Sequence, residues 1–316
     1  MMYLALTAAF FLLINIYFKL AAHYNIIDKP NERSSHTSIT IRGGGIVFVI
    51  AALVALCLDF QAFGIPAIGV IIIGAISFLD DIYSLPNKVR LLFHITAVSL
   101  MFYYLAVFTT FPVYIIAGFY ILVIGIINAY NFMDGINGIT GLYSLVTLCA
   151  LQFVNMEHVH FINEDMIWLP VLACVVFLFY NFRKKAACFA GDVGSVTIAF
   201  WIVTLLLKLI LFTGEWKYLL LLSVYGVDAV LTIIHRLSLK QNIFKAHRLH
   251  FYQIMANERK IPHLLVAASY AIVQGIIDIF VVGNQHSLPV NIGLVCVPLV
   301  LIYVIFKPQL MHKIAA

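Results

Sequence analysis

The chain has 316 residues, of which 63% are hydrophobic and only 10% are charged, and its formal net charge at pH 7 is +5. Soluble domains contain about 45–50% apolar residues, so this composition excludes a soluble protein and predicts an integral membrane protein. The positive charge requires no nucleic-acid partner, because the anionic surface of a lipid bilayer and anionic substrates account for it.

Apolar runs make up most of the chain. Each is close to the about 17–25 residues that cross a bilayer as a helix, and the connections are short. We expect eleven membrane helices, over residues 3–22, 43–60, 64–79, 90–109, 111–129, 137–154, 166–182, 194–213, 216–234, 263–282 and 288–306. The third run is the shortest. No soluble domain fits between them, so we predict one all-α membrane domain over residues 1–316.

Basic residues gather in every second loop between the apolar runs, for example at Arg42, Arg90, Lys184 and Lys240. The loops on the opposite side of the membrane contain only one basic residue, Lys217. By the positive-inside rule, the N-terminus lies outside and the C-terminus in the cytoplasm, which agrees with an odd number of spans. The expected cytoplasmic loops cover residues 23–42, 80–89, 130–136, 183–193 and 235–262. Every polar cluster described below falls on this side, so we expect the functional site there.

The first cytoplasmic connection ends in Arg42 and the glycine triplet 43–45. The glycines permit either tight helix packing or a close approach to phosphate, and Arg42 can face a pyrophosphate or lipid headgroups. The third run ends in Asp80 and Asp81. Adjacent carboxylates repel unless a cation or a proton lies between them, so this pair suggests a divalent metal, although solvated acidic helix ends are also common.

The fifth and sixth runs are joined by a polar segment that contains Asn128, Asn131, Asp134, Asn137 and two glycines. Such residues are costly beside hydrocarbon unless they line a polar cavity. Amide side chains both donate and accept hydrogen bonds, which suits a nucleobase or a phosphate. A simple turn would need only one Asn-Gly pair, so we interpret this segment as part of a binding site.

Two further clusters follow along the chain. Asp192, at the start of the eighth run, is placed like a helix N-cap, and exposed amides there could also hold a phosphate. His247, Arg248 and His250 lie in the longest cytoplasmic loop. Two imidazoles beside a guanidinium form a phosphate-binding set, whereas a zinc site would lack a third ligand at suitable spacing. A solvated basic loop is the structural alternative.

Asp228 lies about two turns inside the ninth run. Ionisable residues within membrane spans are usually paired, and we expect Asp228 to be an internal hydrogen-bond partner near the site or a partner of His235. Asp278, near the outer end of its run, looks structural.

Acids, amides and a His/Arg cluster without a Ser/His/Asp or Cys nucleophile motif point to phosphoryl chemistry, in which positioning and charge neutralisation dominate. The P-loop pattern is absent from the sequence. Because the site lies at a membrane, one substrate is expected to be a lipid.

Four motifs carry a resemblance. They are Asp-Asp-x-x-x-Leu-Pro at 80–86, Asn-x-x-Asn-x-x-Asp-Gly-x-x-Gly at 128–138, Gly-Asp-x-Gly-Ser at 191–195 and His-Arg-x-His at 247–250. Their order is similar to that of the polyprenyl-phosphate N-acetylhexosamine-1-phosphate transferases of glycosyltransferase family 4, which also include the phospho-N-acetylmuramoyl-pentapeptide transferase. Residues 33–45 and 227–232 look more like the branch that initiates O-antigen or capsule repeats.

The resemblance implies an enzyme of the bacterial inner membrane that depends on Mg²⁺, for which Mn²⁺ can substitute. Undecaprenyl phosphate would attack a UDP-N-acetylhexosamine or its 6-deoxy relative, releasing UMP on the cytoplasmic face and starting a lipid-linked polysaccharide. Dimers occur in this family. The implied catalytic and metal-binding residues are Asp80, Asp81 and Asp192, the nucleotide-sugar pocket comprises Asn128, Asn131, Asp134 and Asn137, and the phosphates are held by Arg42, His247, Arg248 and His250.

The pKa of the lipid phosphate bears on the role of Asp80 and Asp81. A phosphate monoester has a second pKa of about 6, so the lipid phosphate is already mostly dianionic at neutral pH. We therefore expect Asp80 and Asp81 to act by metal binding and orientation rather than as a base. Two positions depart from the family pattern, namely Asn137, where many relatives carry aspartate, and Arg248, which interrupts the histidine cluster.

Two other functions fit parts of the sequence. A CDP-alcohol phosphatidyltransferase is also rich in aspartate, but Asp134-Gly135 lacks the Ala-Arg and spaced aspartates expected after it. A transporter of an anionic substrate would place charges at mid-membrane and often contain internal repeats, whereas here the motifs cluster at one face.

Overall fold

The computed structural model describes residues 1–28, 39–242 and 248–312. The helices are α1 (Met2–His23), α2 (Ile46–Leu58), α3 (Phe60–Tyr83), α4 (Asn87–Tyr104), α5 (Val107–Thr110), α6 (Val113–Met133), α7 (Ile139–Phe153), α8 (Asp165–Asn181), α9 (Gly191–Thr213), α10 (Ser223–Ser238), α11 (Phe251–Gln253), α12 (His263–Gly283) and α13 (Leu288–His312). Three further helical segments adjoin these α-helices. Val154–His158 and Ile254–Glu258 are π-helical, and Trp216–Leu222 is a 3₁₀ helix.

The all-helical membrane architecture predicted from the sequence is confirmed. Every expected span overlaps a helix, and within the described residues eight helices are long and apolar enough to cross a membrane. The expectation that the third span is the shortest is wrong, because α3 has 24 residues and α2 only 13. Asp59 caps α3 by accepting a hydrogen bond from the Ala62 amide, so this helix starts earlier than its apolar run and continues through the acidic pair.

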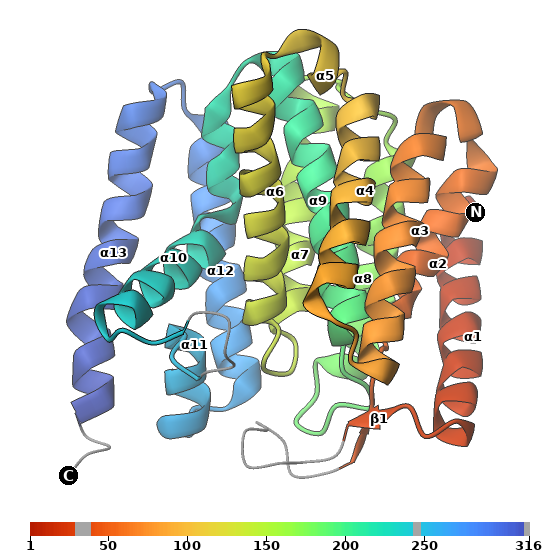
Figure 1. The fold of residues 1–316 in the computed structure, drawn as a ribbon, viewed down its shortest axis with the longest axis horizontal. Coiled ribbons are helices and arrows are strands. Elements are labelled where there is room, and N and C mark those ends of the chain that lie inside the picture. The colour runs from red at the N-terminus through yellow and green to blue at the C-terminus, as the bar shows by residue number, and fades with distance from the viewer. Residues whose placement is uncertain (29–38, 243–247, 313–316) are drawn as a thin grey trace.

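Helix α9 lies in the middle of the bundle and packs against α3, α6, α7 and α2 (Figure 1). It is apolar on all sides, and 78% of its span is buried inside the protein, including Trp201. A helix that is hydrophobic all round needs such a position or lipid around it. By contrast, only 17% of the α13 span is buried, so α13 lies at the periphery.

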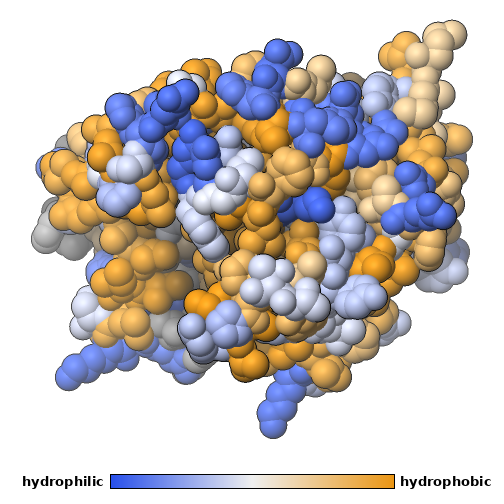
Figure 2. Space-filling view, turned by 90° about the horizontal axis from the view of Figure 1, so that it is seen from above, coloured by the Kyte–Doolittle hydropathy of each residue, from blue (hydrophilic) through white to orange (hydrophobic). Residues whose placement is uncertain are grey.

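The polar motifs lie at one end of the bundle. The end of α3, the start of α4, the end of α6 and the start of α9 lie together at the lower end of Figure 1, with α11 and the C-terminal end of α13. Figure 2 looks onto the opposite end, where hydrophilic side chains are scattered among hydrophobic ones. The candidate site therefore belongs to one face of the molecule.

A two-stranded hairpin braces this end. Strand β1 (Ile27–Asp28) pairs with β2 (Thr40–Ile41), and the chain then runs beside residues 188–190. The Gly44 amide donates to the Phe189 carbonyl. A Cβ atom on Gly45 would lie 2.1 Å from the Gly194 Cα atom. The glycine triplet thus serves close packing of its segment onto the start of α9.

The predicted ninth span is divided in two. A 3₁₀ segment, Trp216–Leu222, precedes α10, which crosses α13 obliquely in Figure 1. The buried positions of α10 include Tyr225, Asp228, Thr232 and Arg236, which recur every three or four residues and form one face of the helix. This face carries Asp228 into the protein beside α11 and α12.

Candidate active site

The Asp81 carboxylate holds the first turn of α9. Its Oδ1 accepts the Asp192 amide proton and its Oδ2 that of Val193, each at 3.0 Å. These amides belong to the helix start, where backbone donors have no partner within the helix. Gly191 has a φ of +72°, and a Cβ there would lie 2.5 Å from Asp81 Oδ2. Glycine at 191 therefore lets the carboxylate reach the helix.

Arg42, predicted to bind phosphate, is paired with Asp81. Its Nε lies 2.8 Å from Asp81 Oδ1, and the Arg42 carbonyl accepts a hydrogen bond from the Tyr17 hydroxyl. Burial lowers the pKa of Arg42, but the combined attraction of Asp81, Asp192 and Asp28 outweighs it and the pKa ends above its usual value. Arg42 thus remains charged, and 37% of its side chain is exposed to a ligand.

Arg90 is the site residue that sequence reasoning missed. Its Nη1 lies 2.9 Å from Asp80 Oδ2 and its Nη2 lies 3.2 Å from Asp192 Oδ2, so one guanidinium bridges two predicted catalytic carboxylates. In the sequence, Arg90 served only as a sign of membrane orientation. Its place in the first turn of the helix after Pro86 was the available signal, because that turn begins beside the end of α3.

Asp192 lies inside the first turn of α9 and does not cap the helix. The N-cap position is Ala190, so the expectation of an aspartate cap is wrong. The Asp192 side chain instead faces Arg90 and lies 3.4 Å from the Asn131 amide nitrogen. Asn131 also accepts a hydrogen bond from the Ser195 hydroxyl at 3.0 Å. The second and third motifs therefore meet directly.

Other side chains of the 128–138 segment have different surroundings. Asn137 Nδ2 donates to the Arg183 carbonyl at 2.8 Å, which ties two loops together. Asn128 Nδ2 donates to the Ile124 carbonyl of its own helix. Burial raises the pKa of Asp134 to about 7, and the charges of nearby Asp192 and Asp81 contribute in the same direction. The structure therefore gives Asn137 a bracing role, and the nucleotide-binding role of these residues remains a prediction.

The histidine motif reaches the same end of the bundle through α11. His247 lies outside the described residues, and His250 is the N-cap of α11. The Tyr252 hydroxyl donates to the Phe132 carbonyl at 2.9 Å. A Cβ on Gly135 would lie 2.2 Å from this hydroxyl oxygen. The glycine of the second motif thus allows α11 to dock on the end of α6.

The arrangement of the carboxylates decides whether a metal ion fits the site. Among the described residues, no group of three His, Cys, Asp or Glu side chains forms a metal site. Asp80 and Asp192 nevertheless share the Arg90 guanidinium, and Asn131 adjoins Asp192. Two carboxylates and an amide suit a hard cation such as Mg²⁺, which takes oxygen ligands and usually completes its shell with water and substrate phosphates. Both oxygens of Asp81 accept backbone amides and one also meets Arg42. Asp80 Oδ1 accepts the Leu85 amide, so the atoms that a cation could share with Arg90 are Oδ2 of Asp80 and Oδ2 of Asp192.

Comparison with known proteins agrees with the geometry. The profile of Glycosyl transferase family 4 matches residues 63–210, which run from α3 into α9 and contain the first three motifs. The chain is 23% identical over 294 residues to the probable undecaprenyl-phosphate N-acetylglucosaminyl 1-phosphate transferase of Bacillus subtilis, covering 85% of this chain and 78% of that protein.

Two other relatives have different named substrates. Phospho-N-acetylmuramoyl-pentapeptide-transferase of Streptococcus thermophilus is 26% identical over 59% of this chain and 62% of its own length. Decaprenyl-phosphate N-acetylglucosaminephosphotransferase of Mycobacterium tuberculosis is 29% identical over 57% of this chain and 52% of its own length. The chain therefore spans less than two thirds of both of these relatives.

Proposed function

Because this chain belongs to the polyprenyl-phosphate hexosamine-1-phosphate transferase family, we propose that it transfers a sugar-1-phosphate from a UDP-sugar to a polyprenyl phosphate. The convergence of three motifs on one cluster carries the proposal. Asp80 comes from the end of α3, Asn131 from the end of α6 and Asp192 from the start of α9, and Arg90 joins two of them. Phosphoryl transfer needs such a set of positioned charges and little covalent chemistry.

In the proposed reaction, an oxygen of the lipid phosphate forms a bond to the β-phosphorus of the UDP-sugar. The bond between this phosphorus and the oxygen bridging to the α-phosphate breaks, and UMP leaves with the electron pair. The lipid phosphate is already mostly dianionic at neutral pH, so no strong base is needed. The products are UMP and a polyprenyl-diphospho-sugar.

Different side chains are proposed to bind the metal, bind the phosphates and position the site. Asp80 and Asp192 would hold Mg²⁺, which when bound neutralises phosphate charge and supplies Lewis acidity. Arg90 and Arg42 place two guanidinium groups beside these carboxylates, where they can hold phosphate oxygens. Asp81 orients the start of α9 and so positions Asp192. Asn131 fixes the neighbouring amide segment, which is proposed to contact the nucleotide.

The finer assignments rest on the sequence. We propose an N-acetylhexosamine or 6-deoxy N-acetylhexosamine as the sugar, undecaprenyl phosphate as the carrier, and a role in starting O-antigen or capsule synthesis. Residues 33–45 and 227–232 support that branch. The distribution of basic loops supports an active site on the cytoplasmic face of the inner membrane.

The test is a direct assay of UMP release. Purified protein is mixed with Mg²⁺, undecaprenyl phosphate and each of several UDP-N-acetylhexosamines, 6-deoxy sugars and UDP-N-acetylmuramoyl-pentapeptide, with and without chelator. We expect chelator-sensitive UMP formation with one donor. Formation with the pentapeptide donor alone would assign the peptidoglycan branch instead. Silence from folded protein across the panel would favour transport of an anionic substrate.

A further inference from the structure

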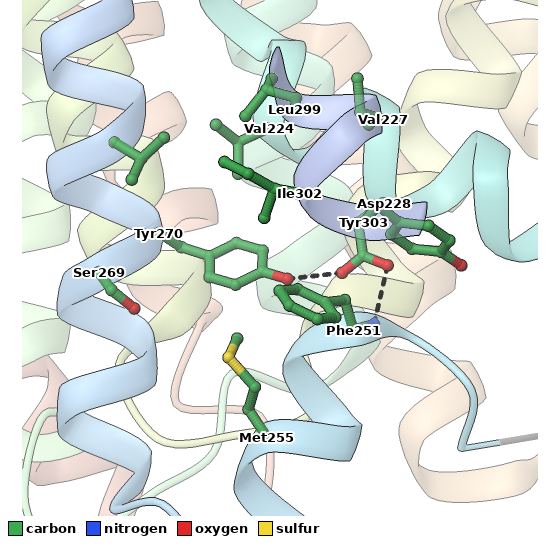
Figure 3. A pocket seen from close by; sticks show the side chains of 11 residues that line it. Val224, Val227, Asp228, Phe251, Met255, Ser269, Tyr270, Leu299, Ile302 and Tyr303 are labelled. Carbon is green, nitrogen blue, oxygen red and sulfur yellow. Dashed lines mark hydrogen bonds between the residues drawn. The ribbon is translucent and has the colours of Figure 1, made fainter. Parts of the chain in front are cut away.

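Asp228 is a buried carboxylate that does not belong to the arginine-paired cluster, the group that Asp80, Asp81 and Asp192 form with Arg42 and Arg90. It projects from the buried face of α10 and is only 3% exposed. Figure 3 shows it between Tyr270 of α12 and Phe251 of α11, with a hydrogen bond to each. A buried carboxylate is costly unless its oxygens are fully engaged, so its contacts indicate what it is for.

Four hydrogen-bond donors converge on Asp228. Its Oδ1 accepts the Phe251 amide proton at 2.9 Å and lies 3.2 Å from the Thr232 hydroxyl. Its Oδ2 accepts the Tyr270 hydroxyl proton at 2.7 Å and lies 3.5 Å from the Tyr252 amide nitrogen. Two of these donors are successive backbone amides at the start of α11. The carboxylate therefore fixes the segment that follows the histidine motif.

The same carboxylate also faces the imidazole of that motif. His250 Nδ1 lies 3.4 Å from Asp228 Oδ1, and the two side chains are 2% and 4% exposed. The His250 amide in turn donates to Gln253 Oε1 at 3.3 Å, which closes a capping box at the start of α11. A carboxylate beside one ring nitrogen sets the tautomer and the orientation of an imidazole.

Helix α13 contributes the positive end of this network. Lys307 is 3% exposed, and its ammonium contacts the Tyr303 hydroxyl and lies 3.5 Å from Thr232 Oγ1. The Tyr303 and Thr232 hydroxyls are 2.8 Å apart. A chain of polar contacts thus runs from Asp228 through Thr232 and Tyr303 to a buried cation, which offsets the charge of the carboxylate.

An apolar cavity of about 180 Å³ adjoins the network (Figure 3). Asp228 and Tyr270 form part of its wall, and most of its other lining residues are apolar, among them Phe251, Leu299 and Ile302. In such low-dielectric surroundings, charged and hydrogen-bonded contacts are stronger than in water. The cavity therefore strengthens the hold of Asp228 on its partners.

We propose that Asp228 is a positioning residue for the reaction and acts through His250. It orients the buried His250 imidazole and anchors the backbone on the C-terminal side of the histidine motif, so that this end of the motif is held in one fixed arrangement beside the proposed diphosphate site. This inference rests on the proposed function. It agrees with one of the two sequence expectations for Asp228, an internal hydrogen-bond partner near the site, and differs from the other, a pairing with His235.

The test is a double-mutant cycle with Asp228→Asn and His250→Gln, assayed by UMP release. Asp228→Asn should lower kcat by about 10–100-fold, as for other residues that orient a functional histidine, with little change in the KM for the UDP-sugar. If Asp228 acts through His250, the double variant should be no slower than His250→Gln alone. Multiplied losses in the double variant would overturn the proposal.

Two further variants separate positioning from folding. Asp278→Asn alters a carboxylate of equal burial, 3% exposed and bonded to Gln274, and should leave kcat near the wild-type value. Tyr270→Phe removes one hydrogen bond to Asp228 while keeping the ring. It should lower kcat by about 3–10-fold, the effect of about one ordinary hydrogen bond, because other donors still hold the carboxylate, and should have no effect in the His250→Gln background.

The outcomes distinguish the two hypotheses. If wild-type protein releases no UMP, the proposed function fails. If wild-type protein is active and Asp278→Asn impairs it as much as Asp228→Asn, or if Tyr270→Phe slows the His250→Gln variant further, the positioning role fails while the function stands. Should Asp228→Asn not fold, as judged by thermal unfolding, the Tyr270→Phe cycle decides alone.

Discussion

Asp81 and Asp228 hold helix starts in two different regions of the molecule. Asp81, from α3, accepts the amides of Asp192 and Val193 at the start of α9. Asp228, from α10, receives those of Phe251 and Tyr252 at the start of α11. In both cases a buried carboxylate satisfies orphan donors of a helix distant in the sequence and stands beside a residue predicted to bind phosphate.

The two regions differ in how the negative charge is offset. Asp81 has a direct partner in Arg42 at 2.8 Å, whereas Asp228 is bonded to Tyr270, faces His250 and is linked to Lys307 through the Thr232 hydroxyl. The side chains of Arg42 and Arg90 are partly exposed, at 37% and 25%, whereas Asp228 and Lys307 are each only 3% exposed. We therefore propose that the carboxylate that anchors a helix start, Asp81 or Asp228, does not itself act on substrate in either region.

The largest effect is expected from Asp192→Asn, which tests this separation. Asn cannot replace a carboxylate that neutralises phosphate charge or binds a divalent cation, so kcat for UMP release should fall by at least about 10³-fold. The backbone amide bonded to Asp81 is retained, so the melting temperature should change little. Measuring both quantities on one preparation checks the prediction. Activity within about tenfold of wild type would remove Asp192 from the catalytic set.

Unlike Asp192→Asn, Asp81→Asn should lower the stability of the protein, and its activity should fall as a consequence. One of the two amides at the start of α9 loses its acceptor and Arg42 loses its counter-charge, which should destabilise the protein by about 1–3 kcal/mol. A small displacement of α9 should then lower kcat by about 10²-fold. Thermal unfolding and UMP release report the two losses. An inactive variant with wild-type stability would show that Asp81 contacts substrate or metal instead.

Gly135→Ala tests the docking of α11 in the region around Asp228. The added methyl group would lie 2.2 Å from the Tyr252 hydroxyl oxygen, so α11 must move away from α6 and activity should fall by about tenfold. Gly125→Ala, within the preceding helix α6, is the control, since nothing lies within 4 Å of a Cβ there. The control should keep full activity and gain slightly in stability. Equal activity of the two variants would contradict the observed contact.

The smallest effect is a pH dependence of stability from Asp134, whose pKa burial raises to about 7. Between about pH 4 and pH 7 this carboxyl is protonated in the folded protein and ionised in the unfolded chain. Folding then takes up a proton, so stability from this group falls as the pH rises through that window. Asp134→Asn removes the titration and should lose less melting temperature than wild type between pH 5 and pH 8, by about a few degrees.

An exposed carboxylate at the other end of the bundle, Glu215, provides the control for the pH dependence of the melting temperature. Glu215 has a side chain that is 51% exposed, and Glu215→Gln should keep the wild-type dependence of melting temperature on pH. Parallel pH curves for wild type and Asp134→Asn would show that the Asp134 carboxyl is ionised throughout.

The positions of the four motifs followed from the sequence more reliably than the roles of their residues. The polar runs 80–86, 128–138 and 191–195 do meet at one end of the bundle. Asp81 and Asn137, however, were predicted to act on metal and nucleotide, and the structure shows them holding backbone groups. Arg90 was missed because its two partners come from other helices, and its place in the first turn after Pro86 indicates only that α4 begins near the end of α3.

By itself, the sequence determined that this chain forms apolar helices with polar segments between them. Backbone groups in a bilayer must be satisfied within a helix, so long apolar runs leave little choice of secondary structure. Only the tertiary structure decided which carboxylate meets which cation and which one holds a helix start. Those pairings depend on side chains brought together from α3, α4, α9, α10 and α11 by helix packing at close quarters, as at Gly45 and Gly194, and a distance along the chain does not specify such contacts.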